Sequence, residues 1–253
     1  MQFIASCIDT EKKTFALSEG ESHHIIRVLR RKPGEVIRVF DGKGKAFFGR
    51  ITAFESDKVL GIIIQETGLP VVIRQRDYRI SIYQSLPKGQ KWEWVLEKGC
   101  EVGVDRFIPV ISKHTIKKIN KRSYADKLER WKKITEASAK QCERSDIPEV
   151  FEPVDFNEAV SSLDSRESTV LPLFLWEGEE RETLSSYLKR LSTRPGHIVF
   201  FIGPEGGWSP EEVDIARNSN IPLLGLGTPL LRTETAPIVA ASMALAVLEQ
   251  DGI

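Results

Sequence analysis

The sequence is poor in the residues that build disulfide frameworks and metal sites. Among its 253 residues are three cysteines and four histidines. Cys7, Cys100 and Cys142 are odd in number and far apart, which fits neither paired disulfides nor zinc-ligand spacing. His23 and His24 have no further candidate ligand at metal spacing. We therefore expect free thiols in a reducing compartment and no metal.

Long apolar runs are also missing. No stretch approaches the length of a membrane span, and the N-terminal residues MQFIASCID lack the basic region and the apolar core of a secretion signal. The sequence therefore predicts a cytoplasmic protein with no membrane partner. It contains no internal repeat and no low-complexity tract.

Net charge is absent too, because 36 basic residues balance 36 acidic ones. The charges are unevenly distributed, however. Residues 112–133 carry nine Lys/Arg against two acids, whereas residues 149–182 carry ten acids against two arginines. This division favours one basic face for an anionic partner, although a solvated helix face would give the same basic stretch.

Residues 1–70 are predicted to form a small β-barrel. Strand patterns occupy 2–8, 35–40, 46–54 and 58–65, and the sequence DGKG at 41–44 is a hairpin signal. SEGE at 18–21 is a capping box before a predicted helix over 21–30. A barrel is the simplest closure for these strands, and residues 71–78 are predicted to be a linker.

From residue 79 onward, strands and helices alternate. Predicted strands lie at 80–86, 107–111, 170–176, 197–202 and 221–226, and predicted helices at 88–104, 123–141, 181–191 and 235–250. Such alternation predicts an α/β domain over 79–253, with a parallel sheet covered on both faces. In such sheets, ligands bind outside the carboxyl ends of the strands.

Two of these strands each run into a glycine-rich loop. GPEGG at 203–207 follows the first, and GLGTP at 225–229 follows the second. Glycine loops let the backbone approach a ligand closely, although each alone is also typical of an ordinary strand-to-helix turn. Neither loop matches the dinucleotide fingerprint or the phosphate-binding P-loop.

The motifs GPEGGWS at 203–209 and GLGTPLLRTETAP at 225–237 resemble the C-terminal signature of SPOUT RNA methyltransferases. The chain most resembles the ribosomal RNA small subunit methyltransferase E family, which methylates N3 of a uridine in 16S rRNA. HIIRVLR at 24–30, LPKGQK at 86–91, EKGCEVGV at 97–104 and QCER at 141–144 extend the resemblance over nearly the whole chain. After Pro109 the family carries an acidic-arginine pair, where this chain has Lys113 and His114.

This resemblance implies a SPOUT-type, trefoil-knotted, parallel-sheet methyltransferase domain preceded by a PUA-like β-barrel domain. General topology rules would argue against a knot. The implied methyl donor is S-adenosylmethionine (SAM), without a metal. The residues implied to bind it are Leu175, Glu177, Ile202, Gly203, Glu205, Gly206, Leu224, Gly225, Leu226, Gly227, Leu230, Leu231, Thr233, Thr235 and Ala236. By residue type alone, each leucine could equally be core packing.

Methylation at N3 requires loss of a weakly acidic proton. Glu205 and Glu234 are the candidate bases, and Arg144 and Arg232 could hold a phosphate or a developing oxyanion. Arg232 and Glu234 could instead form a structural pair. The predicted RNA contacts, which could also be ordinary surface charges, are Arg27, Arg30, Arg31, Lys88, Lys91, Lys113 and Arg144.

The last predicted helix is apolar around most of its circumference, which indicates burial on several sides. The family resemblance implies a homodimer through this C-terminal domain, whereas composition alone also allows burial within one subunit. We expect a methyltransferase acting on 16S rRNA, within the 30S subunit. The alternatives are a SPOUT enzyme for another rRNA or tRNA site, including ribose 2′-OH, and a non-catalytic rRNA-binding assembly factor.

Overall fold

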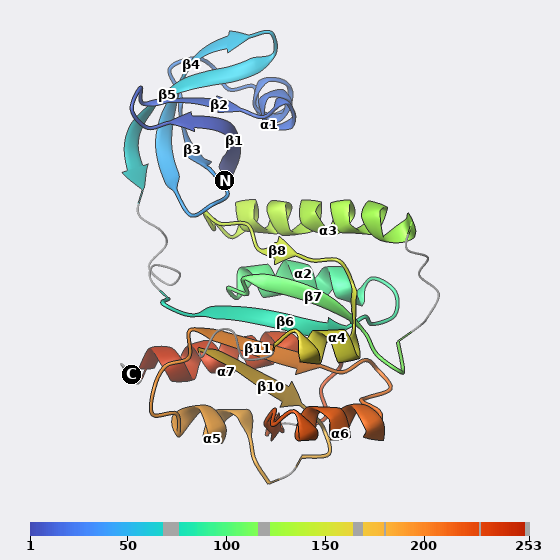
Figure 1. The fold of residues 1–253 in the computed structure, drawn as a ribbon. Coiled ribbons are helices and arrows are strands. Elements are labelled where there is room, and N and C mark those ends of the chain that lie inside the picture. Colours follow the sequence, from blue (N-terminus) through green and yellow to red (C-terminus); the bar gives the residue numbers. More distant parts are fainter. Residues whose placement is uncertain (68–75, 116–121, 164–168, 180, 228, 251–253) are drawn as a thin grey trace. The chain divides into compact units, whose positions relative to one another are not determined.

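The computed structural model describes residues 1–67, 76–115, 122–163, 169–179, 181–227 and 229–250 (Figure 1). These residues form two compact units. The first contains residues 1–75 together with 136–147, and the second contains 76–135 and 148–253. Most of the predicted linker, residues 71–78, lies outside the described residues.

The first unit is a closed five-stranded barrel. Its spatial order is β1-β2-β5-β4-β3, and a parallel pairing of β1 with β3 closes it. Alternate side chains, including Phe15, Val39 and Phe47, fill the interior. The predicted barrel is therefore confirmed, with the strands β1 (Gln2–Asp9), β2 (Thr14–Leu17), β3 (Val36–Phe40), β4 (Ala46–Glu55) and β5 (Lys58–Thr67).

The helix predicted over 21–30 is divided in the structure. The Ser18 hydroxyl accepts a hydrogen bond from Glu21 N and begins α1 (Glu19–His23), after which a π-helical turn, His24–Val28, continues the chain. The wider π turn ends at Leu29, and Arg30 has a φ of 51°. The π turn continues the helical pattern of the sequence beyond α1. The positive φ of Arg30 then ends it, because such a backbone conformation interrupts regular helix.

The second unit is a parallel sheet with helices on both faces, as predicted (Figure 1). Its spatial order is β12-β10-β11-β6-β7-β8, and the short strand β9 also pairs with β7. The sheet strands are β6 (Arg79–Ser85), β7 (Arg106–Ile111), β8 (Glu149–Val150), β9 (Val154–Asp155), β10 (Val170–Leu175), β11 (His197–Ile202) and β12 (Leu223–Leu224).

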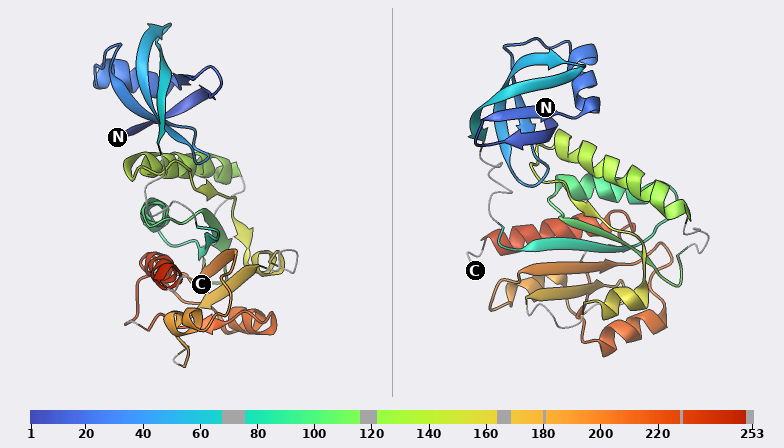
Figure 2. Two further views of the ribbon diagram at one scale, coloured as in Figure 1. Left: turned by 90° about the vertical axis from the view of Figure 1, so that its left-hand side faces the viewer. Right: turned by 45° about the horizontal axis from the view of Figure 1, so that its top comes forward.

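Two apolar cores lie against the two faces of this sheet. One packs Ile80, Ile82 and Phe200 against α2 (Lys91–Glu101), α3 (Arg122–Gln141), α5 (Leu184–Lys189) and α7 (Ala236–Gln250). The other packs Phe201 and Trp208 against α4 (Phe156–Ser161) and α6 (Pro210–Asn218). The left view of Figure 2 shows α7 and α4 on opposite sides of the strands. The knot that the family resemblance implies stays a prediction.

Candidate functional site: a cavity at the carboxyl ends of three neighbouring strands

Three loops meet at one edge of the sheet. They follow β10, β11 and β12, which are neighbours in the order β12-β10-β11 and run parallel, so that their carboxyl ends lie together. The loops enclose a cavity of about 900 Å³, a volume in the range of small-molecule sites. Gly203 and Leu230, separated by 27 positions in the chain, both line it.

The residues predicted to bind the methyl donor gather here. With the exception of Thr235, which lines a neighbouring cavity, every one of them lines this cavity. Leu175, Ile202 and Leu224 are also buried core residues, whereas Leu230 is 84% exposed. Core packing therefore accounts for only some of these apolar side chains, and their binding of the methyl donor stays a prediction. Glu179 and Thr183 also line the cavity, although no motif in the sequence indicated them.

Glycine is required at two positions around this cavity. At Gly225, an added Cβ would lie 2.5 Å from the carbonyl oxygen of Glu179. At Gly207, φ is +67° and a Cβ would lie 2.4 Å from Glu177 Oε1. Any other residue would clash with the loop after β10, which carries Glu177 and Glu179, or would strain the backbone. This explains the glycine-rich pattern of both loops.

Gln84 connects two of the loops, a role that no pattern in the sequence indicates. Its side chain, fully buried at the end of β6, donates hydrogen bonds from Nε2 to the Gly203 carbonyl (3.1 Å) and to Thr233 Oγ1 (2.9 Å). Thr233 Oγ1 in turn donates to the same Gly203 carbonyl (2.5 Å). The loop after β11 and the segment before α7 are therefore tied to one strand.

Charged residues gather at the rim of the cavity. Glu205 Oε1 accepts hydrogen bonds from Lys88 N (3.0 Å) and from Lys91 Nζ (2.8 Å). Burial acts to raise the pKa of Glu205, but the hydrogen bonds from Lys91 and from the backbone outweigh it and lower the pKa below its usual value. The bond to Glu205 likewise raises the pKa of Lys91. Both groups are therefore charged at neutral pH.

Arg232 and Glu234 do not form the structural pair that the sequence left open. Glu234 Oε2 lies 3.6 Å from Lys91 Nζ. The exposed guanidinium of Arg232 has no hydrogen bond or ion pair within the described residues, and it lines both the first cavity and its neighbour. The candidates Glu205, Arg232 and Glu234 thus lie around one site, but their catalytic roles stay predictions.

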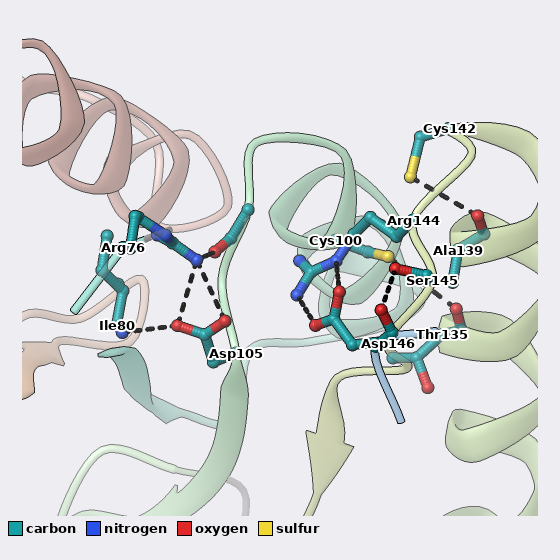
Figure 3. A network of polar contacts seen from close by, with 12 residues as sticks. Arg76, Ile80, Cys100, Asp105, Thr135, Ala139, Cys142, Arg144, Ser145 and Asp146 are labelled. Atoms are coloured by element: carbon teal, nitrogen blue, oxygen red, sulfur yellow. Dashed lines mark hydrogen bonds and ion pairs between the residues drawn. The ribbon is translucent and has the colours of Figure 1, made fainter. Parts of the chain in front are cut away.

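Arg144 has a different environment. Its side chain is fully buried in the first unit and forms an ion pair with Asp146 (Figure 3). The remaining predicted RNA contacts lie at the surface or, in the case of Lys91, at the cavity rim. Arg27 lies 3.6 Å from Asp57, Arg31 pairs with Glu35, and Lys113 pairs with Glu211. Their roles in RNA binding stay predictions.

Lys113 and His114 occupy the loop after β7, where the family carries its acidic-arginine pair. Lys113 N donates to Glu212 Oε1 (2.7 Å), and His114 Nδ1 lies 3.0 Å from the carbonyl oxygen of Gly207. This loop thus contacts the glycine loop that follows β11.

Neither a metal centre nor a membrane span is evident in the described parts of the chain. Within them, no group of three or more His, Cys, Asp or Glu side chains is arranged to hold a metal ion. No helix in these parts is both long and apolar enough to cross a bilayer.

Known proteins resemble this chain over almost its full length. The family profile of an RNA methyltransferase domain matches residues 74–245, and that of an RNA methyltransferase PUA domain matches residues 17–64. Ribosomal RNA small subunit methyltransferase E of Bacillus subtilis is 30% identical over 236 residues, which are 92% of this chain and 90% of that protein.

Solved structures agree with these matches. Ribosomal RNA small subunit methyltransferase E from Neisseria gonorrhoeae, bound to S-adenosyl methionine, is 30% identical with a TM-score of 0.80, covering 95% of this chain and 94% of that one. A methyltransferase from Legionella pneumophila, in complex with the bound cofactor SAM, is 30% identical with a TM-score of 0.82, covering 97% and 96%. The chain therefore belongs to the ribosomal RNA small subunit methyltransferase E family of RNA methyltransferases.

Proposed function

We propose that this protein transfers the methyl group of SAM to N3 of a uridine in 16S rRNA. The observation that carries the proposal is the shared cavity at the ends of β10, β11 and β12, in a chain whose relatives are 16S-type rRNA methyltransferases and whose structural neighbours hold SAM. Because rRNA is made and assembled in the cytoplasm, we place the activity there.

The lining of the first cavity suits SAM. Leu226 and Leu230 offer apolar surface for the adenine, and the loop backbones offer donors and acceptors for its edge and for the ribose hydroxyls. Glu177, Glu179 and Glu205 place negative charge around the cavity, which favours a cationic ligand. When bound, SAM supplies an electrophilic methyl group on its sulfonium. The chain's own contribution is to hold donor and acceptor in alignment.

The barrel is the part of the chain that we expect to bind RNA. The PUA profile matches within it, and Arg27, Arg30 and Arg31 are exposed on the π turn and the residues after it. We propose a functional division into an RNA-binding domain over 1–70, a linker over 71–78 and a catalytic domain over 79–253. The segment 136–147, which packs with the barrel, is then a part of the catalytic chain that supports the RNA-binding domain.

Mass spectrometry of 16S rRNA tests the substrate. In a deletion strain we expect the 3-methyluridine nucleoside to disappear and to return when the wild-type gene is supplied. Calorimetry of purified protein with SAM tests the donor separately. A 3-methyluridine signal that persists in the deletion strain contradicts the assignment of substrate, and binding of SAM without turnover on 30S subunits would favour an assembly factor instead.

We also propose a homodimer formed through α7. Ser242, Ala246 and Glu249 are exposed along one side of this helix, beside the half-buried Val239, and small side chains allow a second helix to approach closely. Ala246→Arg should reduce the mass measured by light scattering from twice the chain's 28.6 kDa to that of one chain. Asp214→Arg, on the exposed side of α6 and on the other face of the sheet, is the control. A variant that keeps the doubled mass excludes this face.

A further inference from the structure

A second cavity of about 720 Å³ adjoins the first, and Lys91 and Arg232 line both. Its other walls come from α2 and from the segment that leads into α7, and they include Trp94 and Glu234. A site that methylates RNA needs two adjacent compartments, one for the donor and one for the acceptor base. The shared pair of cations marks the boundary between two such compartments.

Of the charged groups at this boundary, Lys91 already pairs with Glu205, whereas Glu234 and Arg232 have few partners. Glu234 Oε2 is shielded from solvent and accepts no hydrogen bond within the described residues, although Lys91 Nζ lies 3.6 Å away. The Arg232 guanidinium forms no hydrogen bond or ion pair with the described residues. A buried carboxylate oxygen without a hydrogen bond is costly, so a donor supplied by a ligand would stabilise this arrangement.

We propose that the second cavity binds the uracil ring of the target nucleotide, with Glu234 facing N3–H and with Lys91 and Arg232 facing the two carbonyl oxygens. The pairing edge of uracil reads acceptor, donor, acceptor. The cation, carboxylate and cation of Lys91, Glu234 and Arg232 present the complementary pattern. This inference rests on the proposed function.

The same pattern rejects cytosine. On its pairing edge, cytosine carries a lone pair at N3 and an amino group in place of O4. The N3 lone pair would face the Glu234 carboxylate, and the amino group would face a cation. Buried polar groups left unpaired or opposed reject an analogue far more strongly than a missing apolar contact does. The site therefore selects uridine through its charges.

Trp94 supplies the surface on which the ring lies. Its side chain is 40% exposed although tryptophan is large and apolar, and it is part of the cavity wall. Stacking on an aromatic side chain is the usual way in which proteins hold an unpaired RNA base. The indole therefore holds the ring while the three charged groups read its edge.

The same three residues prepare N3 for reaction. The N3 proton passes to the Glu234 carboxylate, and Lys91 and Arg232 stabilise the negative charge that spreads onto the carbonyl oxygens. Proton and methyl group require the same in-plane direction at N3, so proton loss comes first, and the protonated Glu234 side chain must turn out of this line before the methyl carbon can approach N3. N3 keeps the electron pair that then bonds to the methyl carbon, the pair of the carbon–sulfur bond stays on sulfur, and Glu234 releases its proton to solvent.

Glu205 is less suited to this role. Its Oε1 atom already accepts two hydrogen bonds, and its lowered pKa makes it a weaker base. The charged groups around Glu234 are Lys91, Arg232 and Glu205, with Glu93 and Glu97 also on the cavity wall. Glu205 instead holds Lys91 in place.

Trp94→Leu tests the cavity. On 30S subunits we expect KM for RNA to rise about tenfold through lost stacking, whereas SAM affinity, measured by calorimetry, and the mass by light scattering stay at wild-type values. Phe151→Leu is the matched control, because Phe151 is 41% exposed in the same unit. An unchanged KM overturns the proposal. A changed mass also overturns it, because the cavity would then be a subunit contact.

Glu234→Gln tests the reading of the edge. We expect kcat to fall about 100-fold with SAM affinity unchanged, while Glu149→Gln, which removes an exposed carboxylate paired with Arg106, acts as the control. Binding is measured independently with RNA fragments that carry uridine or cytidine at the target position. Wild type should prefer uridine, and Glu234→Gln should lose most of this preference. If wild type methylates and both Trp94→Leu and Glu234→Gln behave like wild type, the uracil site is contradicted while the proposed function stands. If wild type neither binds SAM nor methylates, the proposed function itself is contradicted.

Discussion

Gln84 connects parts of the chain that lie far apart in the sequence. A lone glutamine on a strand carries no signal that sequence analysis can use, since its role depends on which loops the fold places beside it. The two glycine loops were predictable because runs of glycine and proline after an apolar segment mark a break in the strand, whichever groups later pack against them. The hydrogen bonds from Gln84 to Gly203 and Thr233 exist only after the sheet has formed.

Gln84→Leu should therefore loosen the donor cavity. We expect SAM affinity to fall about tenfold and the free energy of unfolding to drop by about 2 kcal/mol, because buried partners lose their hydrogen bonds. Calorimetry and urea denaturation measure the two effects, with the exposed Gln65→Leu as the control. In a double-mutant cycle with Thr233→Val, losses that simply add would show that the two side chains act independently.

The ion pair of Glu205 and Lys91 predicts a dependence of stability on pH. The folded-state pKa of Glu205 lies below its usual value of 4.5, so the carboxylate stabilises the fold above pH 4.5, and that contribution disappears as pH falls through the folded-state pKa. The difference in unfolding free energy between wild type and Glu205→Gln should be constant above pH 6 and should shrink towards pH 3. A difference that grows on acidification would reverse the sign and exclude this pairing.

At the scale of elements, long periodic segments were predictable and short ones were not. β11, His197–Ile202, matches its prediction in full, and α3 starts one residue before the predicted start. The two-residue strands β8 and β9 and the six-residue helix α4 were missed. Strands so short contain no alternation to detect, and pairing with β7 alone defines them.

Helix α6 shows a local signal that determines structure. Ser209 Oγ accepts a hydrogen bond from Glu212 N, and Glu212 Oε2 accepts one from Ser209 N, which together form a capping box. Both side chains are buried. The capping box sets the residue at which the chain leaves the glycine loop and enters α6. The same hydrogen bonds therefore position both the start of the helix and the loop that lines the cavity.

Ser209→Ala should cost about 1 kcal/mol of unfolding free energy, because a buried N-cap loses its acceptor. Denaturation in urea gives the value. Asp214→Ala, on the exposed side of the same helix and paired only with Arg217 at the surface, should cost less than about 0.5 kcal/mol. Equal costs for the two variants would mean that the box contributes no more than a surface pair.

At the scale of the whole molecule, chain order and spatial grouping differ. The sequence predicted a simple boundary near residue 70, whereas residues 136–147 belong to the same compact unit as the barrel. The reason lies in particular contacts. Gln2 Nε2 donates to the Ala139 carbonyl (3.2 Å), Arg38 pairs with Glu143 (2.7 Å), and Lys140 pairs with Glu21. None of these contacts produces a periodic pattern in the sequence from which it could be predicted.

Arg144 provides the sharpest test of this grouping. Its guanidinium is fully buried beside Asp146, whose side chain is 33% exposed (Figure 3), so Arg144→Ala should break this ion pair, leave the space of a large buried side chain empty and lower the unfolding free energy by about 2 kcal/mol or more. Arg27→Ala, which breaks only a loose exposed pair with Asp57, should cost less than about 1 kcal/mol. Urea denaturation measures both. A stable Arg144→Ala protein with weakened RNA affinity would instead support the RNA contact that the sequence suggested, and residues 136–147 would then serve the substrate as well as the barrel.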